Sequence, residues 1–520
     1  MFKRLLCNPD CRTIGDNHAK KTIKGHKMSD YHQASLPLLQ SLEPGEADVQ
    51  AILAAFDSQG QTALRWREST AAERIARVKR LRDAMLAQRE AFYAAFAQDY
   101  RKSPAEVEAS EFLPVMDEIR HVLGRLKRWM KPQHRWPTST MLGTSASVQY
   151  QPRGRVLIIA PWNYPLGLCF GPLVSALAAG NTAIIKPSEM TPAVSALMGR
   201  IIAEVFPANE VALFEGAQPT SHALLQLPFD HIFFTGSPAV GKLVMAAAAR
   251  NLTSVTLELG GKSPTIIDET ADLNMAAETL MWGKFINNGQ TCVAPDYVYV
   301  HASVKDAFVA ACRRVLQQRY GATADAQKSS PDLTRIVNQR HTKRVMKLLS
   351  DAVQRGAKVS MGGETDESQC YVAPTILENI PAGAEILSEE IFGPLLPVMP
   401  YTSLDQVIAE INAAPKPLAL YVWSRNKANT QRVLTRTSSG GACVNHCVAH
   451  FAHGNLPFGG VNNSGIGNAH GEYGFKAFSH ERAVLRATPL MLIKMFFPPY
   501  TKTRTSLIRA VVDSLRLPML

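Results

Sequence analysis

Two side chains in this sequence have the chemistry of a nucleophile and a base. Cys292 lies in FINNGQTCVAP, where Asn, Gly and Thr neighbours indicate a loop whose backbone a ligand can approach closely. A cysteine thiolate attacks electrophilic carbon. Glu258 lies in SVTLEL (254–259), where a carboxylate in an apolar strand is desolvated and needs a role or a partner. On base rates alone a cysteine such as Cys292 is more often an inert small hydrophobe, so both readings stay open.

The elements that would position these residues alternate between short apolar runs and helical segments after Gly154. Such runs, separated by helices, predict a doubly wound parallel sheet, and hence an α/β fold. The runs are VLIIA (156–160), TAIIK (182–186), HIFFT (231–235) and SVTLEL (254–259). Before them, apolar residues recur at three- and four-residue steps from about 46 to 130, which predicts helices. Thr70 followed by Glu73 fits a capping box at the start of one of them.

Polar residues follow the ends of these predicted strands. Asn163 comes just after the first, Lys186 ends the second, Gly236 and Ser237 follow the third, and Glu258 ends the fourth. Because ligands bind at the carboxyl ends of the strands in open α/β sheets, these groups could converge on one crevice. Asn163 could instead satisfy its own turn, and Lys186 could be a surface lysine.

The segment FTGSPAVGK (234–242) follows a strand and opens an Ala-rich helix. Gly236, Gly241 and Lys242 have the spacing of a P-loop, but Leu243 stands where that loop needs Ser or Thr to hold magnesium. Backbone N–H groups at a helix N-terminus still bind phosphate. We therefore expect phosphate binding without ATP hydrolysis, and a nucleotide-dependent phosphotransferase is the alternative function.

A cluster of sulfur and imidazole groups near the end of the chain is a weaker candidate, for a metal. It comprises Cys443, His446, Cys447, His450 and His453. The spacing matches no standard zinc pattern, and the apolar residues between them are typical of a strand or core. We expect no metal.

The composition excludes several classes of protein. The chain of 520 residues is 46% hydrophobic and 19% charged, as in a globular enzyme of two or more domains. The net charge of +12 is concentrated at the ends: residues 1–30 hold seven Lys/Arg against three Asp, and residues 491–520 hold five against one. A nucleic-acid partner is therefore not expected. Eight cysteines, no apolar run of about 18 residues and no signal-peptide pattern predict a cytoplasmic protein without an integral membrane segment.

Taken together, the motifs resemble the aldehyde dehydrogenase superfamily over about residues 46–500. LELGGKSP (257–264) is similar to the family's glutamate signature and FINNGQTCVAPD (285–296) to its cysteine signature. APWNYP, KPSE, FTGSPAVG, EEIFGP (389–394) and NLPFGGVNNSG (455–465) occur in the family's order and spacing. The FAQDYRKS segment and the KAFSHERAV ending look most like class 3 enzymes, and among these the bacterial coniferyl-aldehyde type.

The resemblance implies that an aldehyde is oxidised to the acid through a thioester on Cys292. The oxyanion would be held by the Asn163 amide and the Cys292 backbone N–H. Glu258 would activate water for deacylation, its pKa raised by burial toward the range of a general base. Coniferyl-type aromatic aldehydes and medium- or long-chain aliphatic aldehydes fit equally. A catalytically silent homologue is a further alternative, against which the presence of all three residues argues.

For the cofactor, the resemblance implies NAD, with NADP possible. Lys186 and Glu189 would contact the adenosine ribose, and Glu189 favours NAD because a carboxylate accepts from a free 2′-OH and repels a 2′-phosphate. The pyrophosphate would meet the loop from Gly236 through Ser237 to Gly241. The nicotinamide ribose would meet Glu390 and Phe392.

The same reasoning divides the chain into domains, with a Rossmann-like cofactor domain, a second α/β catalytic domain and a small β hairpin that joins subunits into a homodimer. The expected segments are a disordered extension (1–45), the NAD(P)-binding domain (46–136 and 155–261), the catalytic domain (262–455), the oligomerisation elements (137–154 and 484–500) and a C-terminal tail helix (501–520).

Overall fold

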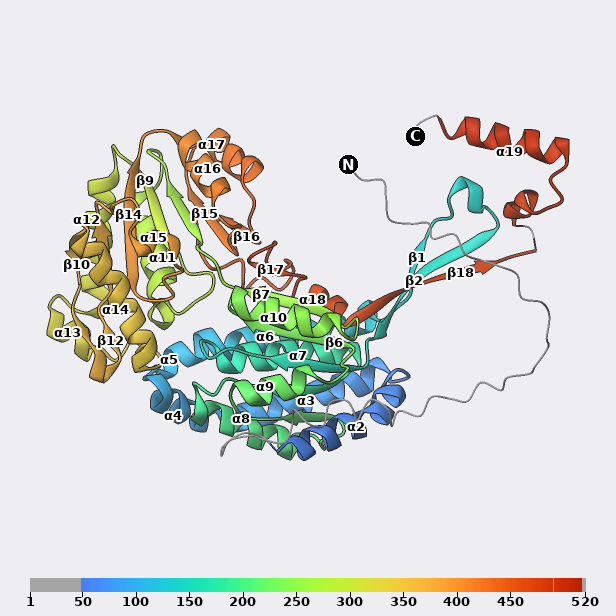
Figure 1. Cartoon of the computed structure of the whole chain (residues 1–520), viewed down its shortest axis with the longest axis horizontal. Coiled ribbons are helices and arrows are strands. Elements are labelled where there is room, and N and C mark those ends of the chain that lie inside the picture. Colours follow the sequence, from blue (N-terminus) through green and yellow to red (C-terminus); the bar gives the residue numbers. More distant parts are fainter. Residues whose placement is uncertain (1–47, 490, 517–520) are drawn as a thin grey trace, which may run out of the picture. The chain divides into compact units, whose positions relative to one another are not determined.

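The computed structural model describes residues 48–489 and 491–516, which are drawn in colour in Figure 1. The expected extension 1–45 lies outside these residues. The described residues belong to one unit, and two large sheets, each with helices on both faces, form most of it.

The first sheet contains the strands predicted after Gly154. Its order is β17-β7-β6-β3-β4-β5, parallel except for β17. The strands are β3 (Arg155–Ile159), β4 (Thr182–Lys186), β5 (Val211–Leu213), β6 (His231–Gly236), β7 (Ser254–Leu259) and β17 (Gly465–Ile466). All four predicted strands and the doubly wound order are confirmed. The strand order reverses at β3, which has β4 on one side and β6 on the other, so the ends of β3 and β6 flank the switch point where ligands bind.

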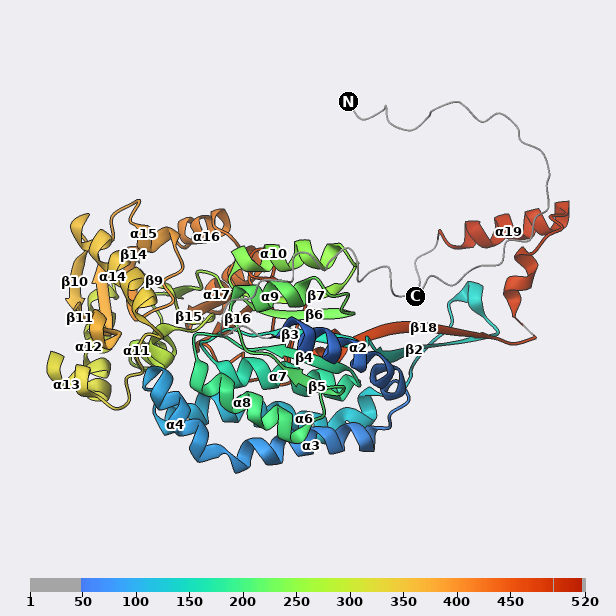
Figure 2. The ribbon, with the colours of Figure 1, turned by 60° about the horizontal axis from the view of Figure 1, so that its bottom comes forward.

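Helices cover both faces of this sheet (Figure 2). The helices α7 (Pro165–Ala179) and α8 (Pro192–Val205) contact one face, and α2 (Val49–Trp66) and α10 (Pro238–Ala249) contact the other. The remaining helices of this region are α3 (Ala71–Ala87), α4 (Arg89–Tyr100), α5 (Pro104–Val107), the π-helical turn η2 (Glu108–Phe112), α6 (Leu113–Trp129) and α9 (Gln218–Leu225). The capping box that starts α3 is confirmed, because the Thr70 hydroxyl accepts from the Glu73 N–H and the Glu73 carboxylate accepts from the Thr70 N–H.

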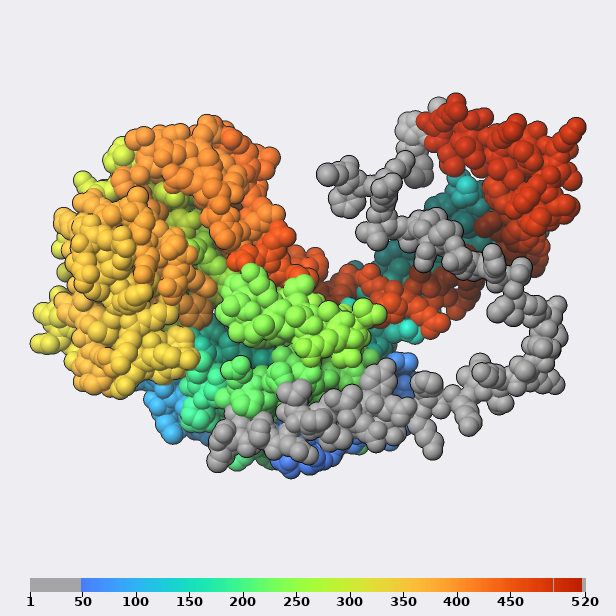
Figure 3. Space-filling model, in the orientation of Figure 1, coloured from blue at the N-terminus to red at the C-terminus, as the bar shows by residue number. Residues whose placement is uncertain are grey.

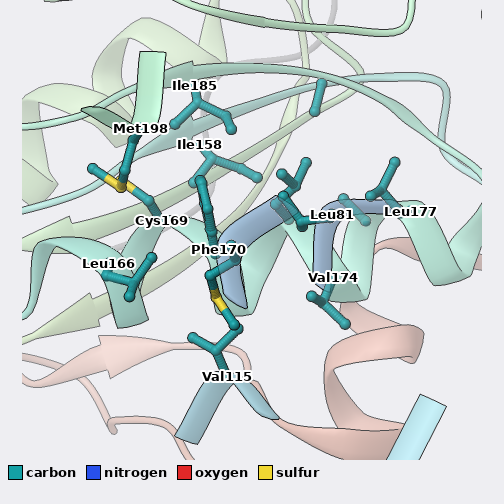
Figure 4. Close-up of a cluster of buried hydrophobic side chains, with 14 of the residues drawn as sticks. Leu81, Val115, Ile158, Leu166, Cys169, Phe170, Val174, Leu177, Ile185 and Met198 are labelled. Atoms are coloured by element: carbon teal, nitrogen blue, oxygen red, sulfur yellow. The ribbon is translucent and has the colours of Figure 1, made fainter. Parts of the chain in front are cut away.

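The core of this region lies between the sheet and α7 (Figure 4). Phe170 of α7 packs among Ile158 of β3, Ile185 of β4, Leu81 of α3 and Val115 of α6, all less than 2% exposed. A helix that is apolar on nearly every face is buried on nearly every face. Because β3 and α7 are both fixed in this core, the short connection between them is fixed as well.

The second sheet has seven strands in the order β10-β13-β14-β9-β8-β15-β16, parallel except for β10. The strands are β8 (Pro264–Ile267), β9 (Tyr297–His301), β10 (Lys358–Met361), β13 (Thr375–Glu378), β14 (Leu395–Tyr401), β15 (Ala419–Trp423) and β16 (Gly441–Val444). The strands predicted in SPTIID and YVYVH are confirmed as β8 and β9.

Helices also cover both faces of the second sheet. The helices α11 (Leu273–Phe285) and α12 (Lys305–Tyr320) pack on one face, and α16 (Leu404–Ala413) and α17 (Lys427–Arg436) pack on the other. The other short elements are η4 (Ile286–Gly289), α13 (Ala324–Ser329), α14 (Gln339–Gln354), β11 (Thr365–Asp366), η5 (Glu367–Gln369), β12 (Tyr371–Val372), α15 (Glu385–Ser388) and α18 (Gly471–Ala477).

A third, three-stranded sheet contains the predicted hairpin. The strand β2 (Thr144–Pro152) pairs antiparallel with β1 (Gln133–Arg135) and with β18 (Ser479–Ala487). The strand-like segment expected within 484–500 starts earlier, at Ser479, and ends at Ala487. Both faces of β18 are largely exposed, so no alternation of apolar and polar residues marks where it begins.

The end of the chain forms the predicted tail helix. It is α19 (Lys502–Ser514), preceded by the 3-10 turn η6 (Leu492–Phe496), while η3 (Ser139–Met141) lies between β1 and β2. Among the described helices, none is long and apolar enough to cross a membrane.

Candidate active site

The loop before Cys292 has an unusual backbone that its sequence explains. Asn287, Asn288 and Gly289 have consecutive positive φ angles of 51°, 52° and 76°. Asparagine and glycine tolerate this left-handed conformation better than other residues. Glycine is also needed for space at 289, because a Cβ there would lie 2.3 Å from the carbonyl oxygen of Gly393. The NNG tripeptide thus turns the chain sharply from α11 toward Cys292.

A hydrogen-bond network holds this loop against the end of β3. The Asn287 side-chain amide donates to the Asn163 carbonyl at 2.7 Å, and the Asn163 side-chain amide donates to the Gln290 carbonyl at 3.0 Å. The Glu106 carboxylate accepts from the Asn287 N–H at 2.5 Å and from the Thr334 hydroxyl at 2.9 Å. The nucleophile candidate and Asn163 are therefore positioned relative to one another by direct contacts.

Glu258 reaches the same place from the end of β7. It is 5% exposed, and its Oε1 has no hydrogen-bond partner. Burial raises the pKa of Glu258 to about 8, the direction expected for a general base. A desolvated carboxylate without a partner is unfavourable for folding, which favours a functional role for it.

A crevice at the ends of the first sheet collects most of the predicted site residues. Asn163, Gly236, Ser237, Glu258, Cys292, Glu390 and Phe392 all line it. The crevice lies where the doubly wound topology puts a ligand, next to β3 and β6. The strand-end residues Asn163, Gly236, Ser237 and Glu258 therefore converge as the sequence pattern predicted.

The surroundings of Cys292 favour the neutral thiol. Burial raises its pKa to about 12, and the nearby carboxylates of Glu258 and Glu390 add to the shift. The attacking species of the predicted chemistry is the thiolate. The thiol must therefore lose its proton during the reaction, when the charges around it change.

The start of α10 closes one side of the crevice. The Ser237 hydroxyl accepts from the Val240 N–H and caps this helix, whose residues form exposed surface drawn green in Figure 3. A Cβ on Gly236 would lie 2.5 Å from the Phe234 ring, and a Cβ on Gly241 would lie 2.8 Å from Leu259. Gly241 thus lets the helix pack close to β7, with its N-terminus directed at the crevice, an arrangement that binds anions.

On the opposite side, Glu390 and Phe392 come from the loop before β14. The Glu390 carboxylate accepts from the Gly261 N–H at 3.0 Å, and burial raises its pKa to about 7. Phe392 has a φ of 43° and packs edge-on against Trp162, with 5.4 Å between ring centroids. The Glu390 carboxylate is thus held by a glycine of the GG pair that follows β7.

Three predicted cofactor residues do not line this crevice. Lys186 is buried at the end of β4, and its ammonium group contacts the exposed Glu189 carboxylate at 2.9 Å. Gly241 lies in α10 behind Ser237. Lys186 and Glu189 thus lie at the end of the neighbouring strand β4, and Gly241 lies in α10. A long ligand in the crevice would reach them with the part that is farther from Cys292.

A second, larger cavity meets the crevice at two residues. Its walls are mainly apolar and include Leu113, Leu168, Trp282, Phe451 and Phe458. Glu258 and Cys292 are the two residues that line both cavities. One ligand can therefore approach Cys292 from the sheet side while another approaches it from the apolar side.

Sequence reasoning missed several residues of the site. His341 and Arg344 of α14 line the crevice, and Glu106 holds the cysteine loop. The buried ion pair of Lys102 with Glu111, 2.9 Å apart, lies beside the Tyr164 ring. These residues lie in helices or, for Lys102, in the loop before α5, and nothing local in the sequence distinguishes them from solvated charges.

The cysteine and histidine cluster near 443–453 is held by contacts within the protein. Cys443 Sγ lies 3.3 Å from His450 Nδ1, and the Cys447 thiol donates to the Thr279 carbonyl at 3.3 Å. In the part of the chain that the structure describes, no group of three or more His, Cys, Asp or Glu side chains could hold a metal ion.

Comparison with known proteins was made by sequence and by structure. The model of the aldehyde dehydrogenase family matches residues 38–484. A Pseudomonas aeruginosa protein named "Probable coniferyl aldehyde dehydrogenase" is 41% identical, covering 90% of this chain and 97% of the relative. The mouse protein named aldehyde dehydrogenase family 3 member A2 is 40% identical, covering 89% and 93%. The predicted resemblance to class 3 and coniferyl-type enzymes is confirmed.

Solved structures agree with the sequence comparison. The substrate-bound state of Staphylococcus aureus AldH superposes with a TM-score of 0.84 at 41% identity, covering 89% of this chain and 99% of that one. A Mycobacterium tuberculosis aldehyde dehydrogenase complexed with NAD+ superposes with a TM-score of 0.76 at 28% identity, covering 85% and 90%.

Proposed function

The chain belongs to the aldehyde dehydrogenase family and oxidises aldehydes, and we propose that it does so through a thioester on Cys292. The observation that carries this proposal is that Cys292 and Glu258 border both the crevice and the apolar cavity. A sulfur and a carboxylate thus lie where these two cavities meet.

Cys292 is the nucleophile, and Glu258 the base that activates water against the thioester. The sulfur attacks the aldehyde carbon and later leaves it when water adds. With a pKa of about 8, Glu258 is ionised in a fraction of the protein molecules near neutral pH. The ionised carboxylate accepts a proton from water more readily than a solvated carboxylate does.

Asn163 and the Cys292 backbone N–H stabilise the oxyanion. One N–H of the Asn163 amide already donates to the Gln290 carbonyl, which fixes the orientation of the amide. An amide has a second N–H that can donate to a developing negative charge. The hydrogen bond to Gln290 thus orients the oxyanion donor.

The residues around the crevice fit a dinucleotide, NAD or NADP. The start of α10 suits a pyrophosphate, and the Thr235 hydroxyl, buried and without a partner, lies at the wall of the crevice. When bound, NAD+ supplies the acceptor for the hydride of the aldehyde and a positive charge. Lys186 and Glu189 would hold the adenosine ribose, and Glu390 the nicotinamide ribose. Glu189 favours NAD.

The apolar cavity is the binding site for the aldehyde chain. Trp282, Phe451 and Phe458 provide aromatic walls, which suit a coniferyl-type aldehyde or a long aliphatic chain. The Pseudomonas aeruginosa relative named "Probable coniferyl aldehyde dehydrogenase" supports an aromatic aldehyde as the substrate.

The three-stranded sheet is the site of dimer formation. Most of β18 is exposed on both faces, and Leu485 within it is 57% exposed. A second copy of the chain that packs here would cover this strand. Sedimentation of the full chain should show a dimer, and a monomer at micromolar concentration would contradict the assignment.

No nucleic acid takes part, and the reaction is expected in the cytoplasm.

One experiment tests the catalytic proposal. The wild type and Cys292→Ala are mixed with NAD+ and an aromatic aldehyde, NADH is followed, and the protein is acid-quenched for intact mass. We expect an acyl adduct on Cys292 and NADH in the wild type, and neither in Cys292→Ala. NADH formation by the variant at the wild-type rate would contradict the thioester route. The same assay excludes the silent homologue, and the family assignment replaces the phosphotransferase alternative.

A further inference from the structure

A third, smaller cavity also borders Glu258. It lies between α6, α7 and α18, and its polar lining comes from Glu258, Glu118, Ser175 and His470. It holds about 30 Å³, and a water molecule needs roughly 10–15 Å³ by such a measure, so one or two waters fit. Among the described residues, Glu258 is the one that borders all three cavities.

The proposed reaction leaves a proton to be removed from Glu258. Aldehyde, NAD+ and water give the acid, NADH and one proton, and Glu258 takes a proton from the attacking water. Glu258 must lose it before it can act again. During deacylation the crevice contains the cofactor and the apolar cavity contains the acyl group. The third cavity shares Pro114, Leu168 and Phe451 with the apolar cavity, but among the three cavities it alone brings Glu118, Ser175 and His470 to the same space as Glu258.

Two titratable groups lie across this cavity from Glu258. The Glu118 carboxylate is 4% exposed, accepts from the Gly471 N–H at 2.7 Å and from the Ser175 hydroxyl at 2.9 Å, and lies 4.0 Å from His470 Nδ1. Burial raises the pKa of Glu118, so that it accepts a proton more readily than a solvated carboxylate does.

His470 connects Glu118 to the surface. Its side chain is 21% exposed, whereas Glu118 is nearly inaccessible. Burial lowers the pKa of His470 to about 4, with Asp117 opposing and His450 reinforcing the shift, and the ring contacts Phe451 and Phe458. A neutral imidazole can take a proton on one nitrogen and release one from the other without keeping a charge.

We propose that Glu118 and His470 relay the proton of Glu258 to solvent through water in the third cavity. This proposal rests on the proposed function of Glu258. The O–H bond of protonated Glu258 breaks and its proton goes to the cavity water, which gives one to Glu118. Glu118 and His470 Nδ1 are 4.0 Å apart, farther than a direct hydrogen bond, so a cavity water carries the proton from Glu118 to His470, which releases one to bulk water. His470 returns to its first tautomer by exchange with solvent, and the Cys292 thiolate that leaves the thioester attacks the next aldehyde. One proton thus leaves per turnover, and the relay needs no oxidant or reductant.

The test is a burst experiment on Glu118→Gln and His470→Asn with NAD+ and an aromatic aldehyde. Glu118→Gln keeps an oxygen that can accept from Gly471 but loses the titratable group. We expect the first-turnover burst of NADH to keep its rate and amplitude, and steady-state turnover to fall about tenfold or more. The thioester should then accumulate by intact mass, and the solvent deuterium isotope effect on turnover should increase.

Ser175→Ala is the matched control, because it removes a hydrogen bond from Glu118 and keeps the carboxylate. A structural role of Glu118 predicts that Ser175→Ala and Glu118→Gln slow the enzyme alike and reduce the burst together with turnover. That result would overturn the relay. Unchanged turnover and isotope effect in Glu118→Gln would overturn it as well.

Two further measurements complete the test. In His470→Gly, added imidazoles should restore turnover at rates that vary with their pKa, a dependence that simple filling of space does not produce. Gly171→Ala narrows the cavity, since Gly171 lines it and a Cβ there meets nothing within 4 Å. It should slow turnover and leave the burst intact. The intact mass of the acid-quenched wild type tests the proposed function separately. If no thioester forms on Cys292 there, the proposed function fails, whatever the variants of the relay show.

Discussion

The Glu258 carboxylate makes the thiolate of Cys292 harder to form, because it adds to burial in raising the pKa of the thiol to about 12. Two groups that both need a negative charge thus lie in one desolvated place. The proposed chemistry uses these charges in sequence: the thiolate is needed for acylation, and the Glu258 carboxylate for deacylation. The positive charge that bound NAD+ would bring accounts for how the Cys292 thiolate can form.

Glu258→Gln should separate the two half-reactions. The amide removes a neighbouring negative charge and cannot take a proton from water, so the pKa of Cys292 should fall and deacylation should slow by about 10²- to 10⁴-fold. Stopped-flow measurement should show a full burst of NADH followed by almost no turnover. If Glu258→Gln turns over at the wild-type rate, Glu258 is not the base of deacylation.

The pH dependence of stability should also change in Glu258→Gln. The folded-state pKa of about 8 lies above the ordinary value of 4.5, so folding takes up a proton at Glu258 between these values, and stability is lost as pH rises from about 4.5 to 8. At pH 7 the loss is 7 minus 4.5 units at about 1.4 kcal/mol each, roughly 3–4 kcal/mol. Glu258→Gln should therefore have a higher Tm than the wild type at pH 7, and no advantage at pH 4.5. Equal melting temperatures at both values would contradict this.

Asn163→Ala should slow acylation by roughly 10²- to 10³-fold, because it removes an oxyanion donor. It also removes the hydrogen bond to the Gln290 carbonyl. The burst rate reports this step directly. Asn163→Asp is the control, since it keeps the size of the side chain and replaces a donor by a negative charge. If Asn163→Asp retains the wild-type burst rate, Asn163 does not stabilise the oxyanion.

Glu189→Gln should shift the preference from NAD toward NADP. The carboxylate repels a 2′-phosphate, whereas a neutral amide can donate to it. The ratio of kcat/KM for NADP to that for NAD should rise about tenfold, with kcat for NAD little changed. Arg200→Gln on the neighbouring helix α8 serves as a charge control. An unchanged ratio in Glu189→Gln would place the ribose elsewhere.

The sequence predicted the parts of the site that lie at strand ends. Asn163, Gly236 and Glu258 converge because each lies at or just after the end of a strand of one doubly wound sheet, and topology brings the ends of those strands together. The roles of Glu390 and Phe392 needed the resemblance, since no periodic pattern surrounds them. The start of β18 could not be placed, because a strand exposed on both faces has no hydrophobic alternation.

Glu106, which sequence reasoning missed, provides the last prediction. Its carboxylate accepts from the Asn287 N–H and the Thr334 hydroxyl, and so holds a loop of three left-handed residues that leads to Cys292. Glu106→Ala leaves both donors unpaired in a buried place, which should destabilise the protein by about 1–3 kcal/mol. The burst rate should fall more than the KM rises, because the loop that carries the nucleophile relaxes. Glu106→Gln keeps an acceptor oxygen and should recover most of both losses. If Glu106→Ala melts at the wild-type temperature and acylates at the wild-type rate, the loop is held by its asparagines alone.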